Sequence, residues 1–355
     1  MYDLALYRKY RPKIFKEVLG QNHIVDVLES SVETNKVSHA YLFVGSRGTG
    51  KTSVARIFAS EIGVSVNDMY EIDAASNRGI EDIKELRDGA RVLPFDSKYK
   101  VYIIDEVHML SRDAWGALLK ILEEPPKHVI FILATTEFHK VPETIISRCQ
   151  VFTFKKASDT VCKKMLIEVA KKEGFELEAG SAELLAILAD GSFRDGLGEL
   201  QKVLNFFSQD GPGRKIKREE VEKITGAPKT TLVNDFISAI CEKNMEKGIM
   251  AVRTASSENL DMRLYFKLIV TKFRLAIILR YAPKLKNKMA GDLSEADLEF
   301  LQALVKQDKD KMFNSSTLAI LLEMYRNIDN AFIAELPLEL ALVKIISKDS
   351  DVKVA

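Results

Sequence analysis

The sequence has few cysteines, no long apolar run and almost no net charge. Its three cysteines, Cys149, Cys162 and Cys241, lack CxxC spacing, which excludes a disulfide framework and a zinc ribbon and favours a reducing cytoplasm. No apolar run reaches the roughly 18 residues of a membrane-spanning helix, and residues 1–13 lack the apolar core of a secretory signal, so no membrane partner is expected. The 52 basic side chains nearly cancel the 51 acidic ones, so any nucleic-acid site must be a local patch.

The composition is that of a folded chain with more than one domain. At about one to two hundred residues per domain, a chain of 355 residues predicts two or three domains. Short apolar runs at 41–44, 101–104 and 129–133 alternate with helical patterns, which indicates an α/β domain with a buried parallel sheet. Residues 113–122 show helical spacing that stops before Pro125-Pro126.

The pattern after Phe154 is helical, with no further strand-like run of comparable strength. Turn signals at 190–192 and 209–213 divide it, and amphipathic helices continue from about Lys229 to Lys344. We therefore expect an α/β domain over residues 1–156, a small helical domain over 157–226 and an all-helical domain over 227–355.

A glycine-rich motif links the first apolar run to a helical run at 53–62. It reads Gly45-Ser46-Arg47-Gly48-Thr49-Gly50-Lys51-Thr52. In this context the glycines let backbone N–H groups curl around a phosphate, and the following helix presents its positive end. We expect Lys51 to reach the β and γ phosphates of a nucleotide and the Thr52 hydroxyl to help hold Mg²⁺. A chance glycine-rich turn would not require the strand and the helix at these places.

Polar residues follow the other two apolar runs. Asp105 and Glu106 come after 101–104, where one carboxylate can orient Mg²⁺ and the other can polarise the attacking water. We assign these roles to Asp105 and Glu106 respectively, and give no catalytic role to His108, which can simply pack or bond locally. After 129–133 we choose Thr136 over Thr135 to sense hydrolysis, although a threonine at a strand end is more often a local cap.

Two arginines have both a functional and a structural interpretation. Arg148 can complete a neighbouring subunit's site as an arginine finger, or form a surface ion pair. Arg194, at a helix start, can bridge to the γ-phosphate and couple the domain angle to the nucleotide state, or pair with Asp195 or Glu199.

Further segments accompany these motifs along the chain. They are Tyr10 to Pro12, Gly20-Gln21, His39 to Phe43, Glu71 to Ser76, Asp105 to Leu110, Leu118 to Lys120, Glu123 to Pro126, Leu133 to Thr136 and Ser147 to Cys149. Together with the phosphate loop they resemble the gamma/tau subunit family of the bacterial DNA polymerase III clamp loader. The resemblance is specific through about Leu200 and implies an AAA+ ATPase with a helical lid domain and a helical collar that oligomerises.

The resemblance implies ATP and Mg²⁺ as ligands and gives each motif residue a role. The loop 45–52 and Ser53 contact the phosphates, Thr52 and Asp105 contact Mg²⁺, and Asp105 and Glu106 form the Walker B pair. Thr136 is sensor 1, Arg194 is sensor 2 and Arg148 is the finger that acts in trans. The segment that lies on the adenine contains Arg11, Pro12, Val18 and Leu19.

The resemblance also implies contact with primer-template DNA through helix N-termini and basic side chains, which read shape rather than bases. The candidates are Asn77, Arg78, Arg112 and Lys120. Each taken singly is nearly as compatible with an exposed polar residue on a solvated face.

Two departures from the family pattern matter. Residues 62–70 form a short, cysteine-free connector where the family usually carries a four-cysteine zinc module, so no zinc is expected. The sequence ends near the end of the expected collar, so we expect a gamma-like length, whether by nature or by truncation, in place of the long tau extension.

The sequence therefore predicts an ATP-dependent motor subunit that opens a sliding clamp and loads it onto primed DNA in the bacterial replisome. Its expected partners are the clamp, subunits of the delta and delta-prime type, and further copies joined through the collar. The alternatives are a replication factor C-like small subunit, a catalytically silent scaffold and a DNA helicase. The DEVH, EEPP and LATT segments disfavour a replication factor C-like subunit, and the intact phosphate loop and carboxylates disfavour a silent scaffold. The sequence shows no second RecA-like domain, which disfavours a helicase.

Overall fold

The computed structural model describes residues 4–211, 213–285 and 295–347. The chain divides into two compact units: unit 1 comprises residues 1–162 and 189–198, and unit 2 comprises residues 163–188 and 199–355. The expected division into three domains remains a prediction. Within the described ranges, no helix has the length and apolar character needed to cross a lipid bilayer.

Unit 1 is built on a five-stranded parallel sheet, which confirms the predicted α/β class. The strand order is β2-β3-β4-β1-β5, with bounds Ala40–Val44 (β1), Met69–Asp73 (β2), Lys100–Asp105 (β3), Val129–Thr135 (β4) and Gln150–Thr153 (β5). The three runs predicted from the sequence correspond to β1, β3 and β4, the central strands. These strands are buried on both faces, which explains their nearly continuous apolar sequence.

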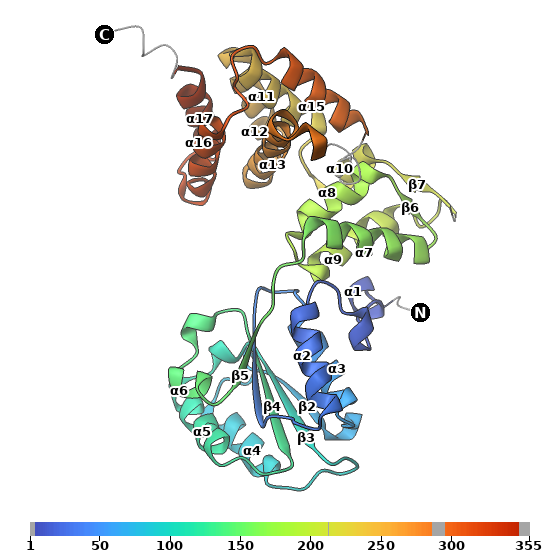
Figure 1. Cartoon of the computed structure of the whole chain (residues 1–355), viewed down its shortest axis with the longest axis vertical. Helices are drawn as coiled ribbons and strands as arrows, with labels where there is room; N and C mark the ends of the chain where they lie inside the picture. The colour runs from blue at the N-terminus through green and yellow to red at the C-terminus, as the bar shows by residue number, and fades with distance from the viewer. Residues whose placement is uncertain (1–3, 212, 286–294, 348–355) are drawn as a thin grey trace. The chain divides into compact units, whose positions relative to one another are not determined.

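Alternating side chains of the strands build one core on each face of the sheet. Figure 1 shows the helices that cover the two faces. On β1, Leu42 packs on the face covered by α4 (Ile80–Ala90) and α5 (Arg112–Glu123), while Tyr41 and Phe43 pack on the face covered by α2 (Asn22–Glu33) and α3 (Lys51–Glu61). The short elements of this unit are α1 (Leu6–Lys9), η1 (Phe15–Glu17), η2 (Val66–Asp68), η3 (Val107–Met109), η4 (Phe138–Lys140) and α6 (Glu143–Ile146).

The bounds of α5 follow from its end residues. The Ser111 hydroxyl caps the helix by accepting a hydrogen bond from the Ala114 N–H at 3.2 Å. The helix ends at Glu123, two residues before Pro125, as the sequence predicts.

Helices dominate the rest of the chain. Three of them, α7 (Asp159–Lys172), α8 (Ala179–Ala189) and α9 (Phe193–Phe206), contribute residues to both units. Unit 2 continues with α10 (Arg218–Thr225), α11 (Thr230–Glu242), α12 (Met245–Ser257), α13 (Met262–Tyr281), η5 (Pro283–Leu285), α15 (Glu295–Gln307), α16 (Ser315–Arg326), η6 (Ile328–Asn330) and α17 (Leu336–Ser347). It also holds a parallel pair of two-residue strands, β6 (Glu176–Leu177) and β7 (Lys215–Ile216), which are too short to produce a sequence pattern.

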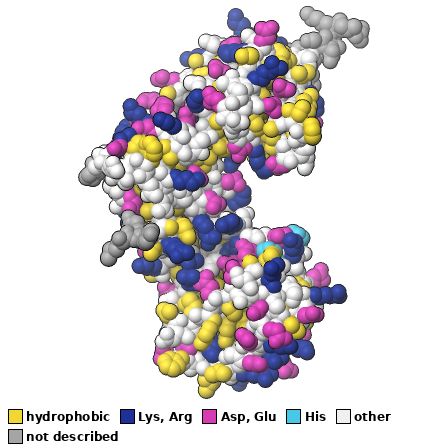
Figure 2. Space-filling view, turned by 180° about the vertical axis from the view of Figure 1, so that it is seen from behind, with side chains coloured by type: hydrophobic (Ala, Val, Ile, Leu, Met, Phe, Trp, Pro, Cys, Tyr) yellow, Lys and Arg dark blue, Asp and Glu magenta, His cyan; other side chains and the backbone are white. Residues whose placement is uncertain are grey.

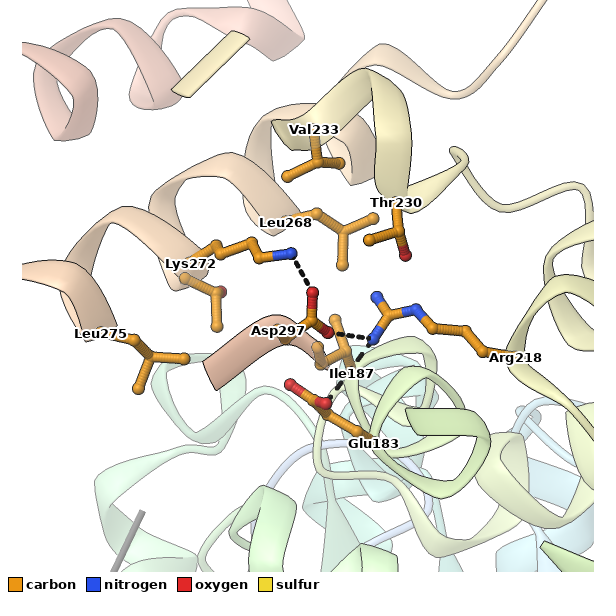
Figure 3. A pocket seen from close by; sticks show the side chains of 10 residues that line it. Glu183, Ile187, Arg218, Thr230, Val233, Leu268, Lys272, Leu275 and Asp297 are labelled. Atoms are coloured by element: carbon orange, nitrogen blue, oxygen red, sulfur yellow. Dashed lines mark hydrogen bonds and ion pairs between the residues drawn. The ribbon is translucent and has the colours of Figure 1, made fainter. Parts of the chain in front are cut away.

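A buried cluster of charges joins four helices of unit 2 (Figure 3). Asp297 of α15 forms ion pairs with Lys272 of α13 and with Arg218 of α10, the latter at 3.1 Å. Glu183 of α8 lies 3.6 Å from the same guanidinium. Burial raises the pKa of Glu183 to about 7, because the lost hydration outweighs the attraction of Arg218.

We expect Glu183→Gln to stabilise the chain at pH 8 and to leave its stability unchanged at pH 5. Between the ordinary pKa of 4.5 and the folded value of about 7, the folded chain binds more protons than the unfolded chain, so stability falls as the pH rises. Glutamine resembles the neutral carboxyl, and the variant should gain about 1–3 kcal/mol at pH 8. Thermal melting at both pH values measures this, with exposed Glu168→Gln on α7 as the control. Equal melting temperatures for Glu183→Gln and wild type at pH 8 would contradict the assignment.

Candidate functional site

The phosphate loop connects the end of β1 to the start of α3. Gly50 caps the helix with a φ of +102°, in a conformation that favours glycine. Gly48 has a φ of +73°, and a Cβ on it would lie 1.9 Å from the Ser192 Oγ. Both positions therefore need glycine, and the first-turn N–H groups of α3 are available for an anion at its positive end.

The side chain of Lys51 is folded into this loop. Its Nζ donates to the carbonyl oxygens of Gly45 at 2.8 Å and Ser46 at 3.1 Å. Burial lowers the pKa of Lys51, although the carboxylates of Glu106 and Asp105 act in the opposite direction. The ammonium group is thus bonded to the backbone of the loop, close to where the loop would bind a phosphate.

Thr52, in the first turn of α3, contacts Asp105 at the end of β3. The Thr52 Oγ1 donates to the Asp105 Oδ2 at 2.6 Å. A hydroxyl and a carboxylate are the hard oxygen donors that Mg²⁺ prefers, so the residues present fit that ion. These are the two side chains that the sequence assigned to it.

Glu106 follows in a left-handed backbone conformation, with a φ of +49°. Its N–H donates to the Asp105 Oδ1 at 2.9 Å, and its Oε2 accepts a hydrogen bond from the Thr136 Oγ1 at 3.0 Å. Thr136, chosen from the sequence over Thr135, is therefore the threonine that contacts Glu106. Thr135 instead accepts a hydrogen bond from the N–H of Glu137 and contacts His108.

Arg194 reaches this region from the start of α9. The neighbouring Phe193 N–H donates to the carbonyl oxygen of Gly48 at 3.0 Å, and the Arg194 guanidinium lies 5.7 Å from the centre of the Tyr7 ring. Of its two suggested partners, Glu199 is paired with Lys202 at 2.7 Å. The helix start and the phosphate loop are thus joined directly by a backbone hydrogen bond.

The segment expected on the adenine is joined to the loop through Arg11. Its Nε donates to the Ser53 Oγ at 2.9 Å, and burial lowers the pKa of the guanidinium. Val18 packs against the core that α3 shares, whereas Pro12 is half-buried and Leu19 is 40% exposed. Of the three apolar residues expected on the adenine, Leu19 is therefore the most exposed.

Arg148 lies away from these contacts, after α6. Its guanidinium pairs with Glu123 at 2.7 Å and donates to the carbonyl oxygen of Thr144 at 2.7 Å. Within one chain it thus forms the surface ion pair that the sequence left open, with its side chain 34% exposed.

Asn77 and Arg78 lie just before α4 and Arg112 begins α5, whereas Lys120 lies in the last turn of α5. The Ser111 N–H donates to the carbonyl oxygen of Arg78 at 3.1 Å, which joins the two helix starts. Arg78, Arg112 and Lys120 are exposed, while Asn77 is half-buried and donates to the carbonyl oxygen of Asp73. Three cationic side chains are thus open to solvent along this stretch.

His108 is the residue at the site that the sequence analysis did not use. Its ring is buried between Glu106 and Glu137, at 3.4 Å from each carboxylate. Its place two residues after Glu106 was the available signal in the sequence. As for metals, the described ranges hold no group of three or more His, Cys, Asp or Glu side chains able to bind an ion, and the absence of zinc remains a prediction.

A phosphate loop after β1, carboxylates after β3 and a hydroxyl after β4 of this sheet define an AAA+ P-loop ATPase fold. Solved structures agree: the RuvB branch migration motor of Thermotoga maritima matches with a TM-score of 0.53 at 21% identity, over 66% of this chain and 80% of that one. A protein-family profile described as "DNA polymerase III, delta subunit" matches residues 20–73 and 64–158.

Curated relatives then give the family. DNA polymerase III subunit tau of Bacillus subtilis is 40% identical over 80% of this chain and 53% of its own length. DNA polymerase III subunit gamma of Buchnera aphidicola is 33% identical over 79% of this chain and 80% of its own length. The chain belongs to the DNA polymerase III gamma/tau family. It spans about half the length of the tau and gamma/tau relatives from Bacillus subtilis, Mycoplasma genitalium and Escherichia coli.

We expect Lys51→Ala to weaken ATP binding on the order of a hundredfold or more, because it removes the buried cation of the loop. Isothermal calorimetry measures the affinity, and exposed Lys36→Ala, just after α2, is the matched control. The melting temperature of the nucleotide-free variant should stay close to that of wild type, since Lys51 bonds only two carbonyl groups of its own loop. An unchanged ATP affinity would remove Lys51 from the site.

Proposed function

We propose that this chain is an ATP-dependent motor subunit of a DNA polymerase III clamp loader, which opens the sliding clamp and releases it around primed DNA when ATP is hydrolysed. The observation that carries the proposal is the pair of side-chain hydrogen bonds from Thr52 to Asp105 and from Thr136 to Glu106, in a chain of the gamma/tau family. A catalytically silent scaffold would have no need to keep these two contacts.

The residues divide the work of phosphoryl transfer. The α3 N-terminus and Lys51 bind the phosphates, and Lys51 exchanges the carbonyl oxygens of Gly45 and Ser46 for phosphate oxygens. Thr52 and Asp105 would hold Mg²⁺, which neutralises charge on the phosphates. Glu106 accepts the proton of the attacking water, and Thr136 orients its carboxylate.

Two arginines link hydrolysis to other parts of the assembly. Arg194 would move from the ring of Tyr7 to the γ-phosphate, and the bond from Phe193 to Gly48 passes the change to α9. Arg148 would exchange Glu123 for the γ-phosphate of a neighbouring subunit, which completes that site in trans.

The partners follow from two surfaces. Arg78 and Arg112 are exposed beside the N-termini of α4 and α5, and Lys120 is exposed in the last turn of α5. Exposed cations of this kind suit the phosphates of primer-template DNA. On α17, Leu336, Leu340 and Val343 share one helix face and are each about 40% exposed, and Ile333 precedes them at 49%. Figure 2 shows hydrophobic side chains gathered over these C-terminal helices. This stripe supports assembly through the collar, with further copies and with delta-type subunits.

Glu106→Gln should keep ATP affinity and lower the hydrolysis rate at least about a hundredfold, because an amide cannot accept the proton of water. The variant should hold the clamp in the presence of ATP and fail to release it on primed DNA. Calorimetry, phosphate release and clamp retention on DNA measure the three properties, with exposed Glu124→Gln as the matched control. Wild-type turnover in Glu106→Gln would place the base elsewhere.

Arg148→Ala should preserve ATP affinity and lower hydrolysis on the order of a thousandfold, since a finger acts on a neighbour's nucleotide. Mixing it with Lys51→Ala subunits gives interfaces that pair an intact loop with an intact finger. DNA-stimulated ATPase in the mixture, above the sum of the two parents, is the expected result once particle mass shows co-assembly. Normal hydrolysis by Arg148→Ala alone would make this arginine a structural ion pair with Glu123.

A further inference from the structure

The imidazole of His108 stands between two carboxylates. Its Nδ1 lies 3.4 Å from the Glu106 Oε2 and 3.1 Å from the Thr135 Oγ1, and its Nε2 lies 3.4 Å from the Glu137 Oε1. Only 6% of the side chain is exposed. The ring therefore has little freedom, and each of its nitrogens faces a carboxylate oxygen.

The contact with Glu106 falls on a particular oxygen. Oε2 also accepts the hydrogen bond from the Thr136 Oγ1 at 3.0 Å, so the hydroxyl and the ring approach the same atom. The Glu106 backbone is fixed as well, by its N–H bond to Asp105. With Thr136 and His108 both at Oε2, the orientation of the Glu106 carboxylate is restricted, and its Oε1 points away from these two side chains.

The far end of the ring is braced by Glu137. The N–H of Glu137 donates to the Thr135 Oγ1 at 3.0 Å, and its carboxylate pairs with Lys140 of η4 at 2.8 Å. The hydrogen bond from Lys140 lowers the pKa of Glu137, which keeps this carboxylate charged. Glu137, the end of β4 and His108 thus form one connected brace behind Glu106.

We propose that His108 is a positioning residue for the Glu106 carboxylate, and that Glu137 fixes the ring from behind. The inference rests on the proposed ATPase function, in which Glu106 accepts the proton of water. A base must lie within hydrogen-bond reach of that water, and a misplacement of about 1 Å costs on the order of a hundredfold in rate.

Two substitutions separate the two nitrogens of the ring. The side-chain amide of Asn lies near the position of Nδ1, and that of Gln extends to the position of Nε2. His108→Asn should keep the contact to Glu106 and retain kcat within about threefold, while His108→Gln should lower kcat about 10- to 100-fold. The KM for ATP should be unchanged in both, since neither touches the phosphate loop. Steady-state ATPase of the full chain with primed DNA measures kcat and KM.

A double-substitution cycle tests the brace from the side of Glu137, and its first arm, Glu137→Ala in the wild-type background, needs no His108 variant. Glu137→Ala, at a side chain 36% exposed, should lower kcat about threefold in wild type and have no further effect in His108→Asn. Exposed Glu143→Ala on α6 is the matched control and should change neither value.

The outcomes distinguish the two proposals. Equal kcat for His108→Asn and His108→Gln, or an additive effect of Glu137→Ala, overturns the positioning role while wild-type hydrolysis stands. A wild-type chain that binds no ATP, or that binds and does not hydrolyse it, overturns the proposed function itself.

Discussion

The register between β1, β3 and β4 is the constraint on which the site depends. Val44 of β1 pairs with Thr135 of β4, and Ile104 of β3 pairs with Leu133 of β4, so the three strands end at the same edge. The register is held by side chains buried on both faces, and a slip by one residue would turn every apolar side chain to the opposite core. The contacts of Thr52 with Asp105 and of Thr136 with Glu106 exist because that slip is costly.

At this edge of the sheet, a strained backbone conformation lies beside polar groups that form hydrogen bonds with one another. Glu106 adopts a left-handed conformation, which is unusual for a residue with a side chain, and its N–H is satisfied by Asp105. Lys51 is buried yet bonded to two carbonyl oxygens. Each group thus has a partner before nucleotide arrives, so binding exchanges partners and does not bury unsatisfied groups.

The sequence predicted the parts of this site that lie at fixed offsets from apolar runs. The loop after β1, the carboxylates after β3 and Thr136 after β4 are of this kind, because a buried parallel strand has a pattern that marks its end. The partners of His108 and Arg148 were beyond reach, since Glu137 and Glu123 lie 29 and 25 residues away and meet them only through tertiary packing. The charge cluster around Asp297 could not be predicted for the same reason, because its members come from four separate helices.

The short connector between α3 and β2 contains a buried carboxylate that accepts several backbone hydrogen bonds. Asp68 is fully buried and accepts hydrogen bonds from the N–H groups of Phe95, Asp96 and Ser97. Burial by itself would raise its pKa, but these donors lower the pKa to about 2, so the charge persists at neutral pH. The connector is thereby tied to the loop that precedes β3, the strand that carries Asp105.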